Sequence, residues 1–291
     1  MAEGIPDRTV DAVLRGGADW LARRGVDQPR IACELLLARL LARPRLSLHL
    51  IGDQTLDDRR LEAMRRGLRR VAADEPVQYV TGQAEFMGHV FATDKRALIP
   101  RPETEVLVRE VLACAPLWQD KTPAIVDAGT GSGCIVLSLA LERPAAHYIG
   151  LDISPDAVAL AQENRQALGA QDRVALAEGE LADTVEPGML DALVSNPPYI
   201  PTSVWETLPA HIREHEPRLA LDGGPDGLAV LEQMVQDATF ALKPQGRLFL
   251  EIGYDQGPRV RALCEEAGFA DIVVAPDLAG RDRVVHARWP G

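Results

Sequence analysis

The segment AIVDAGTGSGCIVLSLA, residues 124–140, restricts the possible folds more than any other part of this 291-residue chain. It joins a short apolar run, a glycine-rich turn and a second, longer apolar run. Gly129, Gly131 and Gly133 permit a tight turn and let a ligand approach the bare backbone. This order predicts a buried strand, a ligand-binding turn and a helix, which together start an α/β domain.

Strand and helix patterns alternate from residue 101 to the end of the chain. A helix should begin near Glu103, because Pro100 and Pro102 precede it. We expect strands over 124–128, 148–153, 174–178, 190–195 and 247–252, and two more over 271–275 and 283–288. Such alternation predicts a parallel sheet of seven strands that is covered by helices on both faces.

The first 75 residues have helical patterns instead. Residues 31–41 are strongly apolar, and Pro44 ends that helix. Residues 58–71 carry apolar side chains at helical spacing, namely Leu61, Met64, Leu68 and Val71. Its other faces carry Arg59, Arg60, Arg65, Arg66, Arg69 and Arg70. These arginines form either a solvated helix face or a docking surface for an RNA-bound or acidic partner.

Residues 76–100 differ from both neighbours, because β-branched and aromatic residues alternate around Gly82 and Gly88. This pattern predicts a hairpin-like connector. We therefore divide the chain into a small all-α bundle over 1–75, a connector over 76–100 and an α/β domain over 101–291.

The net charge of −12 is unevenly distributed, with +1 over residues 1–85 and −13 over the remainder. An α/β domain this acidic repels a phosphate backbone, so we expect no nucleic-acid substrate. The four cysteines form no CxxC pair, which is typical of reduced thiols. The sequence has neither a signal-peptide pattern nor an apolar run of membrane-spanning length, so we expect a cytoplasmic protein.

Polar side chains follow the first two strands of the α/β domain. Asp127, at the end of the first strand, can accept a hydrogen bond from an ammonium group or an ordered water. Thr130 and Ser132 lie within the turn itself. Asp152 ends the next strand, 19 residues beyond Gly133, where a carboxylate can bind both hydroxyls of a ribose.

A dinucleotide site has the same design, so a nicotinamide oxidoreductase is an alternative. The third glycine of GxGxxG would fall at Cys134, however, and the shorter GxGxG is common in methyltransferases, which need no pyrophosphate contact. This favours S-adenosylmethionine as the cofactor. Glu180 and Leu181, after the third strand, are placed to meet the amino group and the ring face of its adenine.

The sequence Asn196-Pro197-Pro198-Tyr199 follows the apolar strand LDALVS. Two consecutive prolines lack backbone donors and hold the chain extended. The Asn196 side-chain oxygen and the Pro197 carbonyl can accept the two N–H groups of a planar amine or amide, while Tyr199 stacks on it. These four residues are the candidate catalytic and substrate-binding set, and they indicate methyl transfer to a planar nitrogen.

A competing pattern, H-x-x-E-H, occurs over residues 211–215. It lies between Pro209 and Pro217, in a polar stretch too short for the buried helix of a zinc protease. A third zinc ligand cannot be identified either. We therefore expect a surface or substrate-facing segment here and no bound metal.

Together these motifs resemble those of the HemK/PrmC family, the N5-glutamine methyltransferases of class-I peptide-chain release factors. The resemblance runs nearly end to end, through ACELLLARLL, EPVQYVTGQAEF, LIPRPETEVLV, DAGTGSG, NPPYIP, EPRLALDGGPDGL, LEIGYDQG and DLAGRDRVV. It implies a helical domain that helps to hold the release factor, a seven-stranded class-I (Rossmann-like) methyltransferase domain, and a substrate glutamine in the GGQ loop of the factor.

Three details qualify this resemblance. Related ribosomal-protein methyltransferases usually enter the domain with arginine–serine–proline, whereas this chain has RPETE at residues 101–105, which favours the release-factor branch. The family commonly has Asp and an aromatic residue where this chain has Glu180 and Leu181. Adenine amino-methylation in nucleic acid uses the same NPPY chemistry and is an alternative, but it requires a basic recognition region.

We expect a monomer.

Overall fold

The structure, a computed structural model, describes residues 7–119 and 122–291. It contains two compact units, one formed by Met1–Gln83 with Ala210–His215, the other by Ala84–Pro209 with Glu216–Gly291. The three-part division at residues 75 and 100 remains a prediction. No helix in the described ranges is both long and apolar enough to cross a membrane.

The helical unit contains α1 (Val10–Ala22), α2 (Pro29–Leu41), the 3-10 helix η1 (Arg45–Ile51), α3 (Asp58–Val71), α4 (Val77–Thr81) and α10 (Ala210–Arg213). The helices expected over 31–41 and 58–71 are confirmed as α2 and α3. The side chains of Thr9 and Asp57 cap α1 and α3 by accepting hydrogen bonds from the backbone of the first turn.

Two glycines let these helices pack closely. A Cβ atom on Gly17 of α1 would lie 2.9 Å from the Sγ atom of Cys33, and one on Gly67 of α3 would lie 2.8 Å from a methyl carbon of Leu36. Both neighbours belong to α2. The buried cysteine therefore serves as a packing residue of the helical core.

A two-stranded sheet of β1 (Gln83–Phe86) and β2 (His89–Ala92) follows α4. Gly88 turns the chain between them with a φ of 75°. Phe86 and Phe91 are buried and meet edge to face, with ring centroids 6.1 Å apart.

The large sheet has the strand order β5-β4-β3-β6-β7-β9-β8. Its strands are β3 (Ala124–Ala128), β4 (His147–Asp152), β5 (Val174–Glu178), β6 (Leu190–Ser195), β7 (Leu242–Glu251), β8 (Ala270–Pro276) and β9 (Asp282–Arg288). All seven expected strands are confirmed. The expectation of a fully parallel sheet is wrong, because β9 runs antiparallel to both β7 and β8. Only a short segment joins β8 to β9, and a parallel pair needs a longer crossover.

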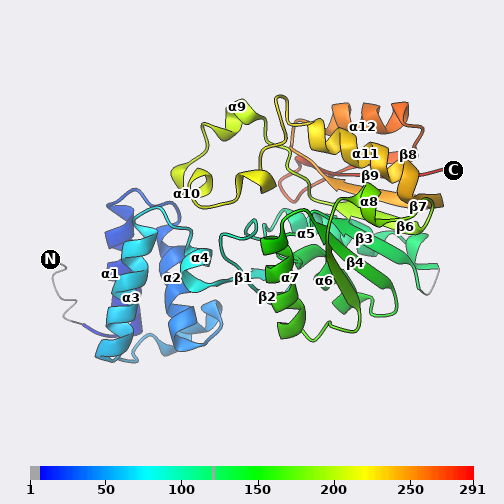
Figure 1. Cartoon of the computed structure of the whole chain (residues 1–291). Helices are drawn as coiled ribbons and strands as arrows, with labels where there is room; N and C mark the ends of the chain where they lie inside the picture. The colour runs from blue at the N-terminus through cyan, green and yellow to red at the C-terminus, as the bar shows by residue number, and fades with distance from the viewer. Residues whose placement is uncertain (1–6, 120–121) are drawn as a thin grey trace. The chain divides into compact units, whose positions relative to one another are not determined.

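Helices cover both faces of this sheet (Figure 1). One face carries α5 (Thr104–Ala113), α6 (Cys134–Glu142) and α7 (Pro155–Ala167), and the other carries α8 (Leu181–Thr184), α11 (Ala229–Ala241) and α12 (Gly257–Glu266). The start of α5 confirms the helix expected near Glu103. Shorter elements of the same unit are η2 (Leu117–Gln119), α9 (Thr202–Trp205) and η3 (Arg218–Ala220). Separate aliphatic cores therefore lie on the two sides of the sheet.

Strand order also creates a crevice. From β3 the chain adds β4 and β5 on one side, and later β6 and β7 on the other. At such a switch point the connections leave the sheet in opposite directions, so a ligand crevice opens outside the carboxyl ends of the strands.

Candidate active site

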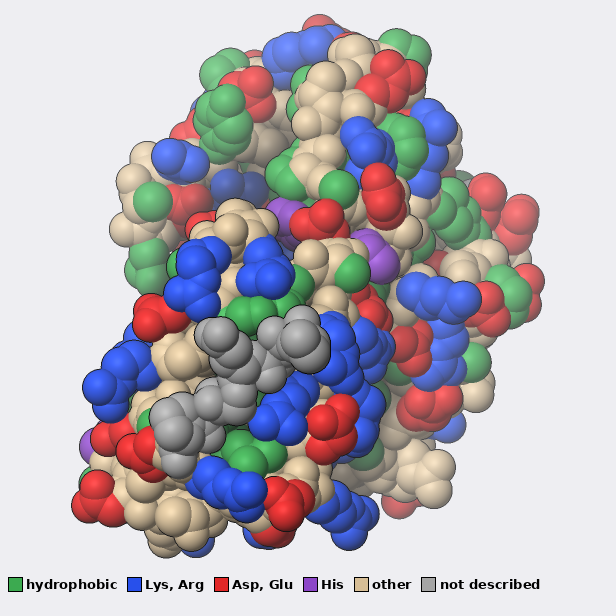
Figure 2. Space-filling view, turned by 90° about the vertical axis from the view of Figure 1, so that its left-hand side faces the viewer, with side chains coloured by type: hydrophobic (Ala, Val, Ile, Leu, Met, Phe, Trp, Pro, Cys, Tyr) green, Lys and Arg blue, Asp and Glu red, His purple; other side chains and the backbone are tan. Residues whose placement is uncertain are grey.

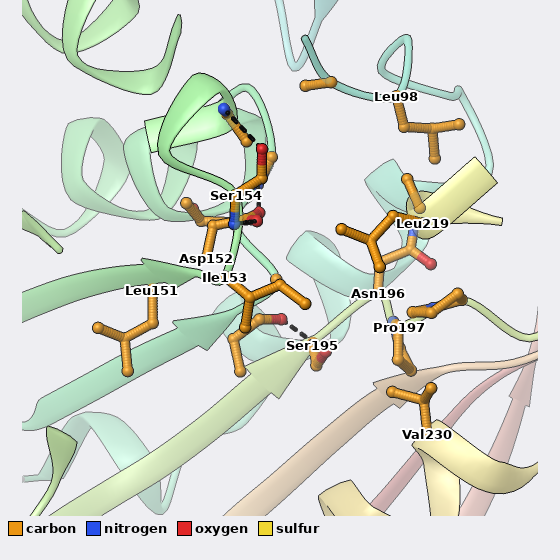
Figure 3. A pocket seen from close by; sticks show the side chains of 18 of the residues that line it. Leu98, Leu151, Asp152, Ile153, Ser154, Ser195, Asn196, Pro197, Leu219 and Val230 are labelled. Atoms are coloured by element: carbon orange, nitrogen blue, oxygen red, sulfur yellow. Dashed lines mark hydrogen bonds between the residues drawn. The ribbon is translucent and has the colours of Figure 1, made fainter. Parts of the chain in front are cut away.

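A cavity of about 440 Å³ occupies this crevice. Its lining comes from the ends of β3, β4 and β6, from residues 96–101, and from the segment after Glu216. Figure 3 shows Asp152 and Ile153 on one side of the cavity and Asn196 and Pro197 on the other. The two candidate motifs of the sequence therefore face one cavity.

The glycine-rich turn forms one wall. Gly129, Gly131 and Gly133 have φ angles of 73°, 56° and 80°, which residues other than glycine adopt only under strain. A Cβ atom on Gly133 would also lie 2.9 Å from a methyl carbon of Leu137. The backbone N–H of Thr130 donates to Leu151, which ties the turn to β4. Thr130 and Ser132 are buried and line the cavity together with Gly129 and Gly131.

Asp127 lies behind the turn and is fully buried. Its Oδ2 atom accepts hydrogen bonds from the Thr130 hydroxyl at 2.7 Å and from the backbone N–H of Val136 at 3.3 Å. Its Oδ1 atom has no hydrogen-bond partner among the described residues. Burial raises the pKa of this carboxyl to about 7. The turn therefore encloses one unsatisfied acceptor.

Asp152 at the end of β4 is buried and lines the cavity. Its Oδ2 atom accepts from the backbone N–H of Gly131 at 2.8 Å, and its Oδ1 atom accepts from that of Ser154 at 2.9 Å. Each carboxylate oxygen keeps a further lone pair for a ligand. Burial raises the pKa of Asp152, whereas these two hydrogen bonds lower it. The carboxylate thus also holds the glycine-rich turn in place.

Glu180 and Leu181 both line the cavity, after the end of β5. Glu180 is exposed and precedes the first residue of α8, and Leu181 is buried. Leu181 therefore offers an apolar surface next to a carboxylate.

Asn196 follows β6 directly, and the Ser195 hydroxyl donates to the carbonyl of Ala128 at the end of β3, at 2.7 Å. The Nδ2 atom of Asn196 donates to the Oγ1 atom of Thr104 at 3.1 Å. No described residue donates to the Oδ1 atom of Asn196 or to the carbonyl of Pro197. The loop therefore presents acceptors to the cavity, which Asn196, Pro197 and Pro198 line.

Tyr199 is placed differently from the rest of its motif, because it is not among the residues that line the cavity. Its hydroxyl donates to the Oε1 atom of Glu251 at 3.3 Å, and its carbonyl accepts from the side chain of Gln256 at 3.0 Å. Burial raises its pKa above the usual value for tyrosine.

Three residues that sequence patterns did not single out shape this site. Thr104 and Glu251 form hydrogen bonds with Asn196 and Tyr199, the two ends of the candidate catalytic loop Asn196–Tyr199. Glu216 is buried, pairs with Arg101, and accepts from the backbone N–H of Ile99 at 3.2 Å, so it joins two walls of the cavity. All three lie within stretches already quoted for the family resemblance, but short motifs do not indicate which side chain meets which.

The H-x-x-E-H segment covers the last three residues of α10 and the two residues that follow. His211 is exposed and His215 is half-buried, and the segment belongs to the helical unit. Among the described residues, no group of three potential metal ligands comes together.

Comparison with known proteins places these features in a family. The model "PrmC N-terminal domain" matches residues 12–82, and "Methyltransferase small domain" matches residues 104–214. The release factor glutamine methyltransferase of Geobacter sulfurreducens is 42% identical over 96% of both chains, and that of Moorella thermoacetica is 46% identical over 90% of this chain and 92% of its own.

A methyltransferase from Pyrococcus furiosus, 13% identical in sequence, aligns with a TM-score of 0.50 over 68% of this chain and 87% of its own. This likeness concerns the fold alone. Nearly full-length matches to the curated relatives are more specific. The chain belongs to the release factor glutamine methyltransferase family, the family that its sequence motifs resemble.

Proposed function

We propose that this protein transfers a methyl group from S-adenosylmethionine to the side-chain amide N5 of the glutamine in the GGQ motif of class-I peptide-chain release factors. The observation that carries the proposal is the orientation of Asn196. Its amide N–H is held by Thr104, and its carbonyl oxygen is left for a substrate amide across the cavity from Asp152.

The cavity fits this cofactor. Asp127 lies just behind the residues that line the cavity, and its Oδ1 atom has no hydrogen-bond partner in the described part of the chain, so it suits an ammonium group reached through an ordered water. Asp152 offers its remaining lone pairs to two ribose hydroxyls, and Leu181 offers an apolar surface to a purine ring. When bound, S-adenosylmethionine supplies an electrophilic methyl group.

The residues of the catalytic loop act on the substrate amide. Asn196 Oδ1 and the Pro197 carbonyl each accept one N–H, which fixes the nitrogen and favours the positive charge that develops on it. The nitrogen gains a methyl group and loses one proton. No strong base is needed, because the proton leaves only after the nitrogen has become acidic. Tyr199 braces the loop through Glu251, and its predicted stacking on the substrate remains part of the proposal.

The decisive experiment compares acceptors. Purified protein is incubated with radiolabelled S-adenosylmethionine and, separately, a release factor, ribosomal proteins or DNA. We expect label in the release factor, and mass spectrometry should place one added methyl group on the glutamine of its GGQ peptide. Label in ribosomal protein or DNA, with none in the release factor, would replace the proposal with one of its alternatives.

Cofactor affinity should depend on pH through Asp127. The pKa of this carboxyl is raised to about 7 in the free protein, and a nearby ligand ammonium favours the charged form. Binding therefore releases a proton below that pH. Affinity should fall by up to about tenfold per pH unit as the pH drops below 7.

Calorimetry at about pH 6 in buffers of different ionisation enthalpy measures this proton release. Asp127→Asn removes the titrating group, so the variant should bind more weakly and with a flatter pH profile. If the wild-type protein released no proton on binding at that pH, Asp127 would have no role in cofactor binding.

Within the helical unit, the arginine-bearing face of α3 is the proposed docking surface for the release factor. Figure 2 looks onto this unit and shows arginine side chains interspersed with acidic ones. Arg65 and Arg69 pair with Glu62, and Arg70 pairs with Glu75. Arg66 is exposed and has no ion pair within the described part of the chain. The positive charge available to a partner is therefore smaller than the number of arginines suggests.

Charge reversal tests this surface. Replacing Arg65, Arg66, Arg69 and Arg70 with Glu should raise KM for the release factor about tenfold at low salt and by less at high salt. Cofactor affinity should not change. As a matched control, the same reversal at the exposed Arg15 and Arg23 of the α1 region should leave KM unaltered. If the wild type, the fourfold variant and the control variant had the same KM, the arginines of α3 would be a solvated helix face with no role in docking.

A further inference from the structure

The orientation of the Asn196 amide is controlled from behind the catalytic loop. Thr104, the first residue of α5, is only 2% exposed and accepts the Nδ2 hydrogen of Asn196 through Oγ1. If this amide turned by half a rotation, Nδ2 would face the cavity, and a donor would stand where the reaction needs an acceptor. Something must therefore prevent Thr104 from donating to Asn196.

Glu251 provides that constraint. It ends β7, is 1% exposed, and accepts a hydrogen bond from the Tyr199 hydroxyl through Oε1 at 3.3 Å. Its Oε2 atom has no hydrogen-bond partner among the described residues, and the Thr104 hydroxyl favours its charged form. An ionised carboxylate only accepts hydrogen bonds, so a neighbouring hydroxyl favours it by turning its proton toward it. A threonine hydroxyl has a single proton. Once it is committed to Glu251, Oγ1 can only accept from Asn196.

The charges around Glu251 come from several elements. Arg283 of β9 favours the ionised form, as do the hydroxyls of Thr104 and Tyr199, whereas Glu103 disfavours it. Burial, the largest effect, raises its pKa to about 7. The Glu251 carboxyl is therefore ionised in mildly alkaline solution, and in that form it can only accept hydrogen bonds.

We propose that Glu251 and Thr104 are positioning residues, which set the direction of the hydrogen bonds behind the catalytic loop so that Asn196 presents Oδ1 to the substrate amide. This inference rests on the proposed function. Neither residue needs to touch a reacting atom. The same carboxylate holds Tyr199, so one buried group orients both polar side chains of the loop.

The test uses the full-length protein at about pH 8.5, where Glu251 is ionised. Thr104→Val keeps the side-chain shape but removes the hydroxyl, and with it the acceptor for Asn196, so kcat on the release factor should fall roughly tenfold. KM for the release factor and affinity for S-adenosylhomocysteine should change by less than about twofold. Thr104→Ser restores the hydroxyl and should recover most of the lost kcat.

The matched control is Thr93→Val. Thr93 is also buried at 2% exposure, but its hydroxyl has no hydrogen-bond partner in the described structure and does not line the cavity. Its kcat should remain that of the wild type. This comparison separates the loss of an orienting hydroxyl from the general effect of a buried Thr→Val change.

Glu251→Gln supplies a second, independent variant should Thr104→Val fold poorly. A carboxamide can donate to Thr104, which frees the threonine proton to face Asn196 and lets the Asn196 amide turn. Its kcat should fall by a similar factor with KM little changed. A wild-type kcat in either variant, or no recovery in Thr104→Ser, would overturn the inference. Absence of methylation by the wild-type protein would instead refute the proposed function.

Discussion

Replacing Asn196 with alanine should lower kcat on a release factor by roughly 10²–10³-fold. The substitution removes the Oδ1 acceptor, whereas the hydrogen bond from Gly131 of the glycine-rich turn to Asp152 remains. Because the acceptor matters most as charge builds on the substrate nitrogen, kcat should fall far more than cofactor affinity. Steady-state kinetics together with calorimetric titration of S-adenosylhomocysteine measure both quantities.

Asn196→Asp is the sharper companion variant. It keeps the shape and an acceptor, but it cannot donate to Thr104 and it adds a negative charge near a cationic cofactor. That charge stabilises the ground state as well, so full activity should not return. Near-wild-type turnover by Asn196→Ala would rule out the proposed mechanism even though the family assignment would stand.

Replacing Asp152 with alanine should weaken binding of S-adenosylmethionine by roughly 1.5–3 kcal/mol, because both ribose hydroxyls lose a charged acceptor. The structure adds a second cause. Asp152 also accepts from the backbone N–H groups of Gly131 and Ser154, so its loss loosens the turn that surrounds the ligand. Isothermal titration calorimetry gives the affinity directly.

Asp152→Asn separates the two causes. Asparagine keeps one acceptor oxygen and the shape of the side chain but not the charge, so its affinity should lie between those of the wild type and of Asp152→Ala. The melting temperature of the ligand-free protein reports whether the turn has become less stable. An affinity of Asp152→Ala equal to that of the wild type would remove this carboxylate from the cofactor site.

Local patterns predicted most of the fold because apolar runs in the chain correspond to buried strands in the sheet. The buried strands β3 and β6 have the bounds that were expected, 124–128 and 190–195. The edge strand β5 also has its expected bounds, although only Val174 in it is buried. The seventh expected strand exists as β9, but it runs antiparallel to its neighbours, and the predicted parallel direction was wrong. Strand direction depends on the length of the connection between two strands and on which strand it pairs with. The pattern of apolar residues gives no information on the pairing partner.

The start of β7 shows a second limit. The pattern predicted a strand from residue 247, whereas β7 begins at Leu242. Residues 243–246, Lys-Pro-Gln-Gly, have the composition of a turn, and Gln245 has a φ of 72°. They lie in the strand because β7 pairs with β6 on both sides of a register shift. The turn preference is therefore expressed as an irregularity between the paired residues Leu242 and Arg247, and pairing with β6 extends the strand across it.

The sequence alone determined the parts of the candidate site that lie within one stretch of chain: the glycine-rich turn, the carboxylate that ends the next strand, and the Asn-Pro-Pro-Tyr loop. The chemistry of these parts depends on residue types and on spacings of a few residues, and both can be read from the sequence. The partners that orient them are distant, since Thr104 lies 92 residues from Asn196 and Glu251 lies 52 from Tyr199. Only the tertiary structure brings these groups together, because the order of strands in the sheet, and not distance along the chain, decides which side chains share hydrogen bonds.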